Sequence, residues 1–294
     1  MVPKRCVFAP GLTIMERLGP VFLGGLALMQ RAAIGLLALI LPLSALARPA
    51  PAATTVPDPC TGRSGLLAEI DRPTIADSPC SVRPGRQIIE FGYAHVRTGD
   101  GTSENGPQLE LRFGLPDGNE LVLLPPNITH GTNSGTVYGG TTVGFKHEWG
   151  YSRHWIGASE ALVTTPRAKG PPGTPDGGWG EAVNGIVGYS VSRHFGLGFM
   201  LGVSSLTGAN NRRYESLNPD LTATWLLDPR CQLYAELYGQ SQTGYGLGAG
   251  FDADGGIQYL LTRHFEVDAE LGQQVSGLLG QHRDYWGVGG GWEF

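Results

Sequence analysis

The sequence predicts an all-β protein, a transmembrane antiparallel β-barrel of about 12 strands that follows a short N-terminal periplasmic segment. Several segments alternate apolar and polar residues over about 10 to 13 positions, which is long enough to cross a bilayer and longer than most soluble strands. The polar face carries small and acidic residues, as a barrel lumen does, and the apolar face would meet lipid. Aromatic residues cluster at strand ends, as in an interfacial girdle: Trp149, Tyr151, Trp155, Tyr189, Phe195, Tyr259, Phe265, Trp292 and Phe294.

Residues 1–47 are expected to be a signal peptide region. Arg31 supplies a short basic start, the apolar run covers Ala32–Leu43, and Ala45–Ala47 has the small-residue pattern of a cleavage site. Because a signal of this length is unusual, we expect translation to start at Met29; the alternative is an N-terminal membrane anchor. Beyond Ala47, no run of 18 apolar residues predicts a transmembrane helix.

The composition agrees with an exported barrel and disfavours a nucleic-acid-binding protein. Charged residues make up 16% of the chain, below the roughly 25% of an average soluble protein. The 46 glycines lack a Gly-X-Y period and lie among aromatic residues, which favours closely packed β-structure. Removal of 1–47 would take four basic and one acidic residue from 21 and 26, leaving a formal charge of −8. This charge does not attract nucleic acid.

Residues 48–86 are expected to form a linker and a disulfide-closed periplasmic or plug segment. A Cys60–Cys80 bond would close a loop of about 21 residues and contribute about 3 kcal/mol on the chain-entropy account. The oxidising periplasm permits this bond, which leaves Cys231 as an unpaired turn residue. The spacing offers no C-x-x-C pair for zinc.

The barrel is expected to span 87–294. Its twelve strands are predicted, from their period-2 alternation, at 87–97, 107–115, 119–124, 138–150, 154–164, 180–191, 194–204, 219–228, 231–241, 247–261, 264–274 and 284–294. The third strand ends early at "LLPPN" (123–127), since proline cannot donate to a ladder. An even strand number places both ends of the barrel on the periplasmic side.

The repeated Arg-His elements in "YSRHW", "VSRHF" and "TRHF" are predicted to mark every second connection, on one side of the barrel. Arg153, Arg193, Arg230 and Arg263 are spaced 40, 37 and 33 residues apart, and each spacing holds two strands, a tight turn and a longer loop. The longer connections, 165–179 and 207–219, would lie outside. The turn histidines are therefore interpreted as solvated rim residues rather than as one metal site, because separate turns cannot converge on a coordination sphere of about 2 Å: His154, His194 and His264.

The C-terminal strand "WGVGGGWEF" places four apolar residues on one face: Trp286, Val288, Trp292 and Phe294. A terminal aromatic residue after an alternating last strand is similar to the recognition signal for outer-membrane barrel assembly. The sequence therefore predicts the barrel-assembly machinery and outer-membrane lipid as partners, and the outer membrane of a Gram-negative bacterium as the location.

The segment 65–95 resembles the start of the outer-membrane proteins grouped as the meta-pathway phenol-degradation, or transporter-like, family. The matching residues are Asp71-Arg72-Pro73, Asp77-Ser78-Pro79-Cys80, Glu90 and Gly92-Tyr93, and the similarity extends over most of 65–294. The resemblance implies a small barrel linked to the passage of hydrophobic or aromatic compounds. It brings no catalytic residues to this chain.

The first functional hypothesis is an outer-membrane channel or transporter for small-molecule solutes, without a cofactor, a metal or catalytic residues. The acidic excess of its predicted lumen would favour cations or neutral solutes over anions. The candidate lumen residues are Glu110, Arg112, Lys146, Glu148, Glu160, Asn184, Glu236, Asp252, Asp254, Gln258, Glu266, Asp268 and Glu270.

Two other classes stay open. A structural or adhesive barrel would bind a partner through its loops, which are modest in length here. An outer-membrane hydrolase would need a nucleophile, a histidine and an orienting group on neighbouring strands. No G-x-S-x-G sequence occurs, and His95, His147 and His282 have no evident serine partner on a neighbouring strand.

Overall fold

The computed structural model describes residues 56–294, apart from 100, 134, 167–169, 171–176, 209–210 and 280–281. The predicted signal peptide and most of the linker lie outside the described residues. Val56–Phe294 forms one compact unit. Its one helix in the described residues, α2 (Gly65–Glu69), is short, and no helix in this part of the chain is long and apolar enough to cross a membrane.

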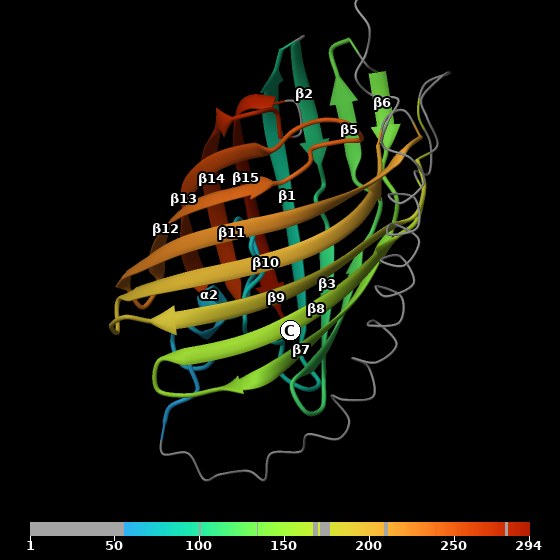
Figure 1. The fold of residues 1–294 in the computed structure, drawn as a ribbon. Helices are drawn as coiled ribbons and strands as arrows, with labels where there is room; N and C mark the ends of the chain where they lie inside the picture. The colour runs from blue at the N-terminus through green and yellow to red at the C-terminus, as the bar shows by residue number, and fades with distance from the viewer. Residues whose placement is uncertain are drawn as a thin grey trace, which may run out of the picture. The chain divides into compact units, whose positions relative to one another are not determined.

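The described strands form one antiparallel sheet that closes on itself, because β15 pairs with β1 along their length (Figure 1). The strands are β1 (Gln87–Thr98), β2 (Gly101–Gly106), β3 (Glu110–Leu115), β4 (Asn119–Leu124), β5 (Ile128–Gly131), β6 (Gly135–Tyr138), β7 (Thr142–Tyr151), β8 (Trp155–Thr164), β9 (Gly180–Ser190), β10 (Phe195–Thr207), β11 (Arg213–Asp228), β12 (Cys231–Gln240), β13 (Gly250–Thr262), β14 (Phe265–Ser276) and β15 (His282–Glu293).

Three barrel strands are each interrupted and therefore appear as two segments. This explains why the described residues form 15 strand segments where twelve strands were predicted. The strand β1 pairs with both β3 and β2, so these two are halves of one barrel strand. The pairs β4 and β5, and β6 and β7, are related in the same way. Counting each pair once confirms a closed, twelve-strand, all-β barrel.

The interruptions lie side by side around Asn127. Its side-chain oxygen accepts the N–H of Gln108, and its carbonyl accepts the N–H of Gly139. The ladder stops here because Pro107, Pro125 and Pro126 have no N–H to donate. The third predicted strand therefore does end early, but the chain resumes as β5.

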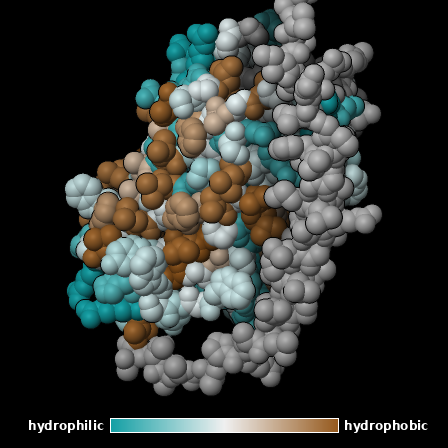
Figure 2. Space-filling view, viewed as in Figure 1, coloured by the Kyte–Doolittle hydropathy of each residue, from teal (hydrophilic) through white to brown (hydrophobic). Residues whose placement is uncertain are grey.

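The barrel is polar inside and apolar outside, the reverse of a soluble protein. On β14, Glu266, Asp268 and Glu270 are buried, whereas Leu271 is 70% exposed. Figure 2 shows apolar side chains over the middle of the visible barrel face and hydrophilic residues toward its ends. Exposed aromatic side chains near the strand ends include Trp155, whose ring lies 4.4 Å from that of Tyr189. This surface fits a lipid bilayer.

One end of the barrel carries short turns and the other carries the longer loops. The turn end has the connections 152–154, 191–194, 229–230 and 263–264, together with the start of β1 and the end of β15. The loop end has the connections 165–179 and 241–249. The asymmetry expected from the Arg-His spacing is therefore present.

The prediction of a loop over 207–219 was wrong, because β11 already begins at Arg213. Residues 213–219 pair with β10, from Arg213 opposite Thr207 to Pro219 opposite Leu201. Pairing of β11 with β12 starts at Asp220, so Pro219 interrupts no rung on that side. The polar composition of 213–219 concealed a strand end that extends toward the loops.

Residues 57–86, called the luminal segment below, lie inside the barrel and contact strands around its circumference. The Cys60–Cys80 disulfide is present in this segment. Leu66, Leu67 and Val82 form an apolar cluster with Ile88 of β1 and Leu260 of β13. The lumen is therefore largely filled at the turn end.

Candidate functional site

A buried ionic cluster holds the luminal segment against β3, β4 and β7. Arg112 is fully buried, and its Nε lies 2.6 Å from Glu120 Oε1. Its Nη1 lies 3.0 Å from both Glu90 Oε1 and Asp71 Oδ2. Lys146 Nζ lies 3.3 Å from Asp71 Oδ1. Since Asp71 is the luminal segment's contribution, these two cations bind the segment to the wall.

Wall carboxylates also accept backbone N–H groups of the luminal segment. Glu90 accepts the N–H of Arg72 at 2.8 Å, Glu120 accepts that of Val82 at 2.7 Å, and Glu148 accepts that of Ser81 at 3.1 Å. Charge-assisted bonds of this kind are about twice as strong as neutral ones. The segment is thus fixed by its main chain as well as by Asp71.

Sequence reasoning missed Glu90 and Glu120 as lumen residues, although both are fully buried. Each occupies an inward position of its strand, between outward apolar neighbours such as Phe91 and Leu121. The period-2 rule that selected the acids of β14 would have found both, if applied equally to β1 and β4.

Arg72 forms a second anchor, which reaches β14 beside the first cluster. Its Nη2 lies 3.2 Å from Asp268 Oδ1, and its Nη1 donates to Gln108 Oε1 at 2.7 Å. The guanidinium lies flat against the wall at Gly92, where a Cβ atom would be 2.3 Å from its Cζ. Glycine at this position therefore permits the close approach, because a larger residue would displace the guanidinium.

The tip of the luminal segment depends on Glu236 of β12. Glu236 Oε2 accepts the N–H of Ile75 at 2.8 Å, and its Oε1 accepts the N–H of Ala76 at 2.9 Å. The Thr222 hydroxyl, on β11, donates to Glu236 Oε1 at 3.2 Å and to Asp220 Oδ1 at 3.3 Å. Two hydrogen bonds thus hold a tip that has no ion pair of its own among the described residues.

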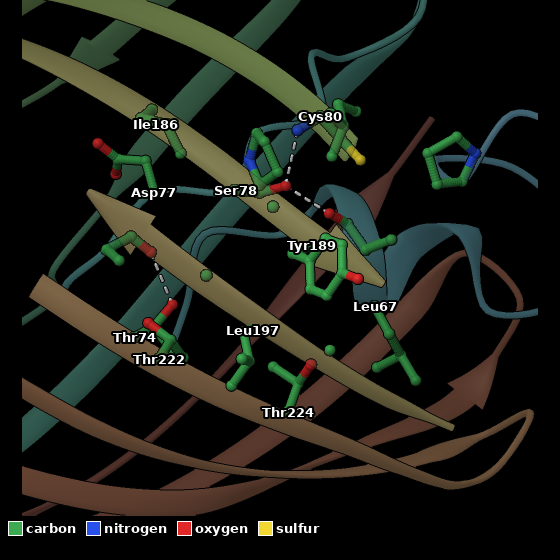
Figure 3. Close-up of a pocket in the computed structure, with 18 of the residues that line it drawn as sticks. Leu67, Thr74, Asp77, Ser78, Cys80, Ile186, Tyr189, Leu197, Thr222 and Thr224 are labelled. Carbon is green, nitrogen blue, oxygen red and sulfur yellow. Dashed lines mark hydrogen bonds between the residues drawn. The ribbon is translucent and has the colours of Figure 1, made fainter. Parts of the chain in front are cut away.

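A cavity of about 230 Å³ lies between the luminal segment and the turn end of β9–β11. In Figure 3, Asp77, Ser78 and Cys80 of the luminal segment lie in the upper part of the view, and Thr222 and Thr224 of the wall lie in the lower part. The wall is thin here, because inward positions of β9 and β10 are glycines, Gly188, Gly196 and Gly198 among the lining residues. We call this the turn-end cavity.

A cavity of about 560 Å³ lies on the loop-end side of the same strands. Its lining includes Ile75 at the luminal tip, Met200 of β10, Asp220 of β11, Tyr238 of β12 and Leu279 of the last loop. We call this the loop-end cavity. It shares the β9–β11 wall with the turn-end cavity.

A buried apolar cluster, called the septum below, borders both cavities. It consists of Ala76 from the luminal tip with Ala158, Ile186 and Met200 from the wall, all buried and in mutual contact. Ile186 pairs with both Ala158 and Met200, so the wall part is one row across β8–β10. The two cavities therefore lie in series along one side of the lumen.

The structure places the sequence-selected lumen residues on the inner face of the barrel. Those that it buries are Arg112, Lys146, Glu160, Asn184, Glu236, Asp252, Asp254, Gln258, Glu266, Asp268 and Glu270. Glu110 and Glu148 are half-buried. Arg112, Lys146, Glu148, Glu236, Gln258 and Asp268 contact the luminal segment.

The turn histidines join neighbouring hairpins at the turn end. The Nδ1–H of His154 donates to the Ser190 carbonyl at 2.9 Å, and that of His194 donates to the Leu226 carbonyl at 3.1 Å. His264 Nδ1 lies 2.8 Å from Glu293 Oε2. In each case the N–H of the partner residue also donates to the histidine carbonyl. The repeated Arg-His element thus adds a rung between one turn and the next strand end.

The residues predicted as the assembly signal lie on the outside of the barrel. Trp286, Val288 and Trp292 are exposed on β15, and Phe294 follows the strand. Phe294 and Gln87 exchange two backbone hydrogen bonds of 3.0 Å, which complete the seam between the first and last strands. Their recognition by an assembly machinery stays a prediction.

Comparison with known proteins gives one family and several similar folds. The family whose model matches residues 70–277 is described as "Putative MetA-pathway of phenol degradation". No curated protein matches the sequence.

Among solved structures, the fold is similar to that of an outer membrane channel from Pseudomonas putida F1. The TM-score is 0.58 at 13% identity, over 75% of this chain and 100% of that chain. The NanC porin has a TM-score of 0.49 at 10% identity, over 70% of this chain and 98% of that one. The CymD monoaromatic hydrocarbon channel has a TM-score of 0.40 at 9% identity, over 72% of this chain and 89% of that chain. The first of these structures shows that the chain shares the barrel fold of the Pseudomonas putida F1 channel. Since the family model matches more than half of its length, this chain belongs to the MetA-pathway phenol-degradation family.

Proposed function

We propose that this protein is an outer-membrane channel for small aromatic molecules, in which the luminal segment is a plug with a movable tip. The observation that carries the proposal is the pair of cavities in series along β9–β11, with the septum bordering both of them. The apolar outer surface supports insertion in a bilayer, and the family supports a link to aromatic compounds.

The proposed path follows β9–β11 because ion pairs occupy the lumen beside β3, β4, β7 and β14. Arg112 and Lys146 fill the side of β3, β4 and β7 with ion pairs, and Arg72 does the same toward β14. Moving those groups would separate buried opposite charges, which costs about 3–5 kcal/mol for one pair. Displacing Ala76 from the septum breaks only two hydrogen bonds to Glu236.

The septum would act as an apolar gate. A narrow apolar constriction excludes ions by dewetting, whereas an uncharged ring can pass between side chains. Met200 is well suited to this role, since its unbranched side chain adapts its shape to its neighbours. We expect a small ionic conductance in the resting protein and passage of aromatic solutes when the tip moves.

The test compares the wild-type protein with Met200→Ala in two measurements. Planar bilayers report the ionic conductance, and liposomes that contain the protein report the uptake of radiolabelled phenol. We expect the variant, with a thinner septum, to raise ionic conductance several-fold and to admit phenol faster. Leu201→Ala is the matched control, because Leu201 is the next residue on β10 and faces outward. Phenol uptake no faster than through protein-free liposomes, for both proteins, would refute the channel.

Heat modifiability on gels should accompany both measurements, because a folded barrel migrates differently from an unfolded one. Wild type and Met200→Ala could show the same conductance and the same phenol uptake, with uptake above the protein-free level. That result would support the channel function but contradict a path through the septum. Fractionation of cell membranes tests the proposed location independently: the protein should separate with the outer membrane, and recovery in the inner membrane would contradict it.

A further inference from the structure

The loop-end cavity is apolar over most of its lining and has one ionisable acid among its described lining residues. Ile75, Met200, Leu206 and Leu279 supply apolar surface, and Tyr214 and Tyr238 supply aromatic surface. Asp220 is that single acid. A pocket of mostly apolar surface with one polar group at a fixed place is the usual form of a small-molecule site.

Asp220 is under-satisfied for a buried carboxylate. The residue is 2% exposed, and its Oδ2 has no hydrogen-bond partner among the described residues. Its Oδ1 accepts a 3.3 Å bond from the hydroxyl of Thr222, which is shared with Glu236, and the Asp220 and Glu236 carboxyl groups are themselves in hydrogen-bonding contact. A buried acceptor without a donor costs about 1–3 kcal/mol, and a ligand that brings a donor recovers that cost.

Three other acids lie near Asp220. Glu236 on β12, Asp254 on β13 and Asp77 of the luminal segment are the charged groups that act on it. Within the described chain, Asp220, Glu236 and Asp254 form no ion pair. The nearby luminal cations are bound elsewhere, to Asp71, Glu120 and Asp268. No cation among the described residues therefore balances the acids at the cavity floor, where the Asp220 and Glu236 carboxyl groups share a hydrogen bond.

The hydroxyl groups of Tyr238 and Tyr285 already take part in hydrogen bonds. The Tyr285 hydroxyl donates its hydrogen to Asp254 Oδ2. The Tyr238 hydroxyl lies 2.9 Å from the Tyr285 hydroxyl and therefore donates to it. Tyr238 thus borders the cavity with its hydroxyl already bonded. A cation held at Asp220 beside this ring gains a favourable interaction with the aromatic face.

We propose that the loop-end cavity binds a small organic cation, a primary ammonium group on an aromatic or short apolar body, with Asp220 Oδ2 as its counter-ion. The inference rests on the proposed function and goes beyond it, because it assigns a ligand to the cavity at the entrance to the path, ahead of the septum that excludes ions. A divalent metal ion fits less well, since calcium takes 6–8 oxygen ligands and Asp220 is the one carboxylate among the described lining residues, beside neutral polar side chains such as Asn184 and Asn218.

The experiment measures equilibrium binding by isothermal titration calorimetry with the purified full-length barrel in detergent micelles. The probes are benzylammonium and the neutral benzyl alcohol, which have nearly the same shape. We expect saturable binding of benzylammonium, about ten-fold or more tighter than that of the alcohol, as for a desolvated charge pair. Equal affinities for the two probes would show a merely apolar cavity and overturn the proposal.

Asp220→Asn should lose about ten-fold or more in benzylammonium affinity and leave benzyl alcohol unchanged. The matched control is Glu215→Gln, on the same strand but facing outward and exposed, which should leave both affinities unchanged. An unchanged affinity of Asp220→Asn for benzylammonium would refute the site. An equal loss of benzylammonium affinity in Glu215→Gln would show that only the net charge of the protein matters, and it would also refute the site.

A second variant keeps the proposal testable if Asp220→Asn does not fold by heat modifiability. Ala182→Trp fills the cavity from β9 and keeps the carboxylate, so it should abolish benzylammonium binding. Retained binding would place the ligand elsewhere. Because binding in micelles needs no transport, failure of the cation site is distinct from failure of the channel, which phenol uptake through Met200→Ala reports.

Discussion

Asp71 Oδ2 lies 3.0 Å from Arg112 Nη1, and both side chains are buried inside the barrel. This contact joins the luminal segment to β3, and the same guanidinium also binds Glu90 and Glu120. Three carboxylates therefore converge on one arginine. Removing the cation would leave them facing one another without a counter-ion, apart from Lys146 beside Asp71.

We expect Arg112→Met to lower the free energy of unfolding by about 3–5 kcal/mol, the cost of breaking a buried pair from one side. The measurement is the urea midpoint in micelles, with heat modifiability as the readout. The control is Arg97→Met, since Arg97 pairs with Asp284 where both are exposed. The control should change stability by less than about 1 kcal/mol. Equal effects of the two variants would contradict a central role for Arg112.

The stability of the luminal segment should fall as pH rises from about 4.5 to 7. Burial raises the pKa of Glu69 to about 7, although Arg83 opposes this shift. Since the folded state holds the proton more tightly than the unfolded state, the contribution of Glu69 is present below pH 4.5 and is lost as pH rises through 7.

In Glu69→Gln the difference between the urea midpoints at pH 5 and pH 8 should therefore shrink. The exposed Glu181 provides the control, because Glu181→Gln should leave that difference unchanged. A variant that keeps the full wild-type difference would show that another group causes the pH dependence.

Replacing the three turn histidines by alanine should lower stability modestly and leave it independent of metal. His154 and His194 each lose one exposed hydrogen bond to a carbonyl, worth about 0.5–1.5 kcal/mol. His264 loses its contact with Glu293. The melting temperature of wild type should be the same with and without EDTA. A fall on chelation that the triple variant lacks would revive the metal site.

The exported protein should have one free thiol. Alkylation of the denatured, unreduced protein should modify Cys231 alone, and reduction should add Cys60 and Cys80. The Cys60→Ser, Cys80→Ser double variant should lose about 3 kcal/mol, because the bond restricts a loop in the unfolded chain. Modification of all three cysteines without reduction would contradict the bond.

Much of the barrel follows from local pattern. The alternation in 265–271 shows which residues of β14 face inward, because successive side chains of any strand point to opposite faces. The spacing of the Arg-His turns and the even strand number likewise predict closure with both ends together, as β1 and β15 confirm. The same reasoning fails at 213–219, where polar residues on both faces remove the alternation from a real strand.

The sequence by itself thus determined the barrel, its twelve strands, most of the inward acids and the Cys60–Cys80 bond. Only the tertiary structure decided which of those acids hold the luminal segment and which are left without a partner. Glu236 meets Ile75 across 161 positions of sequence, and Asp220 is aimed at a cavity that exists only once the tip is in place. The period of a strand tells which way a side chain points, but its partner depends on what the closed ring encloses.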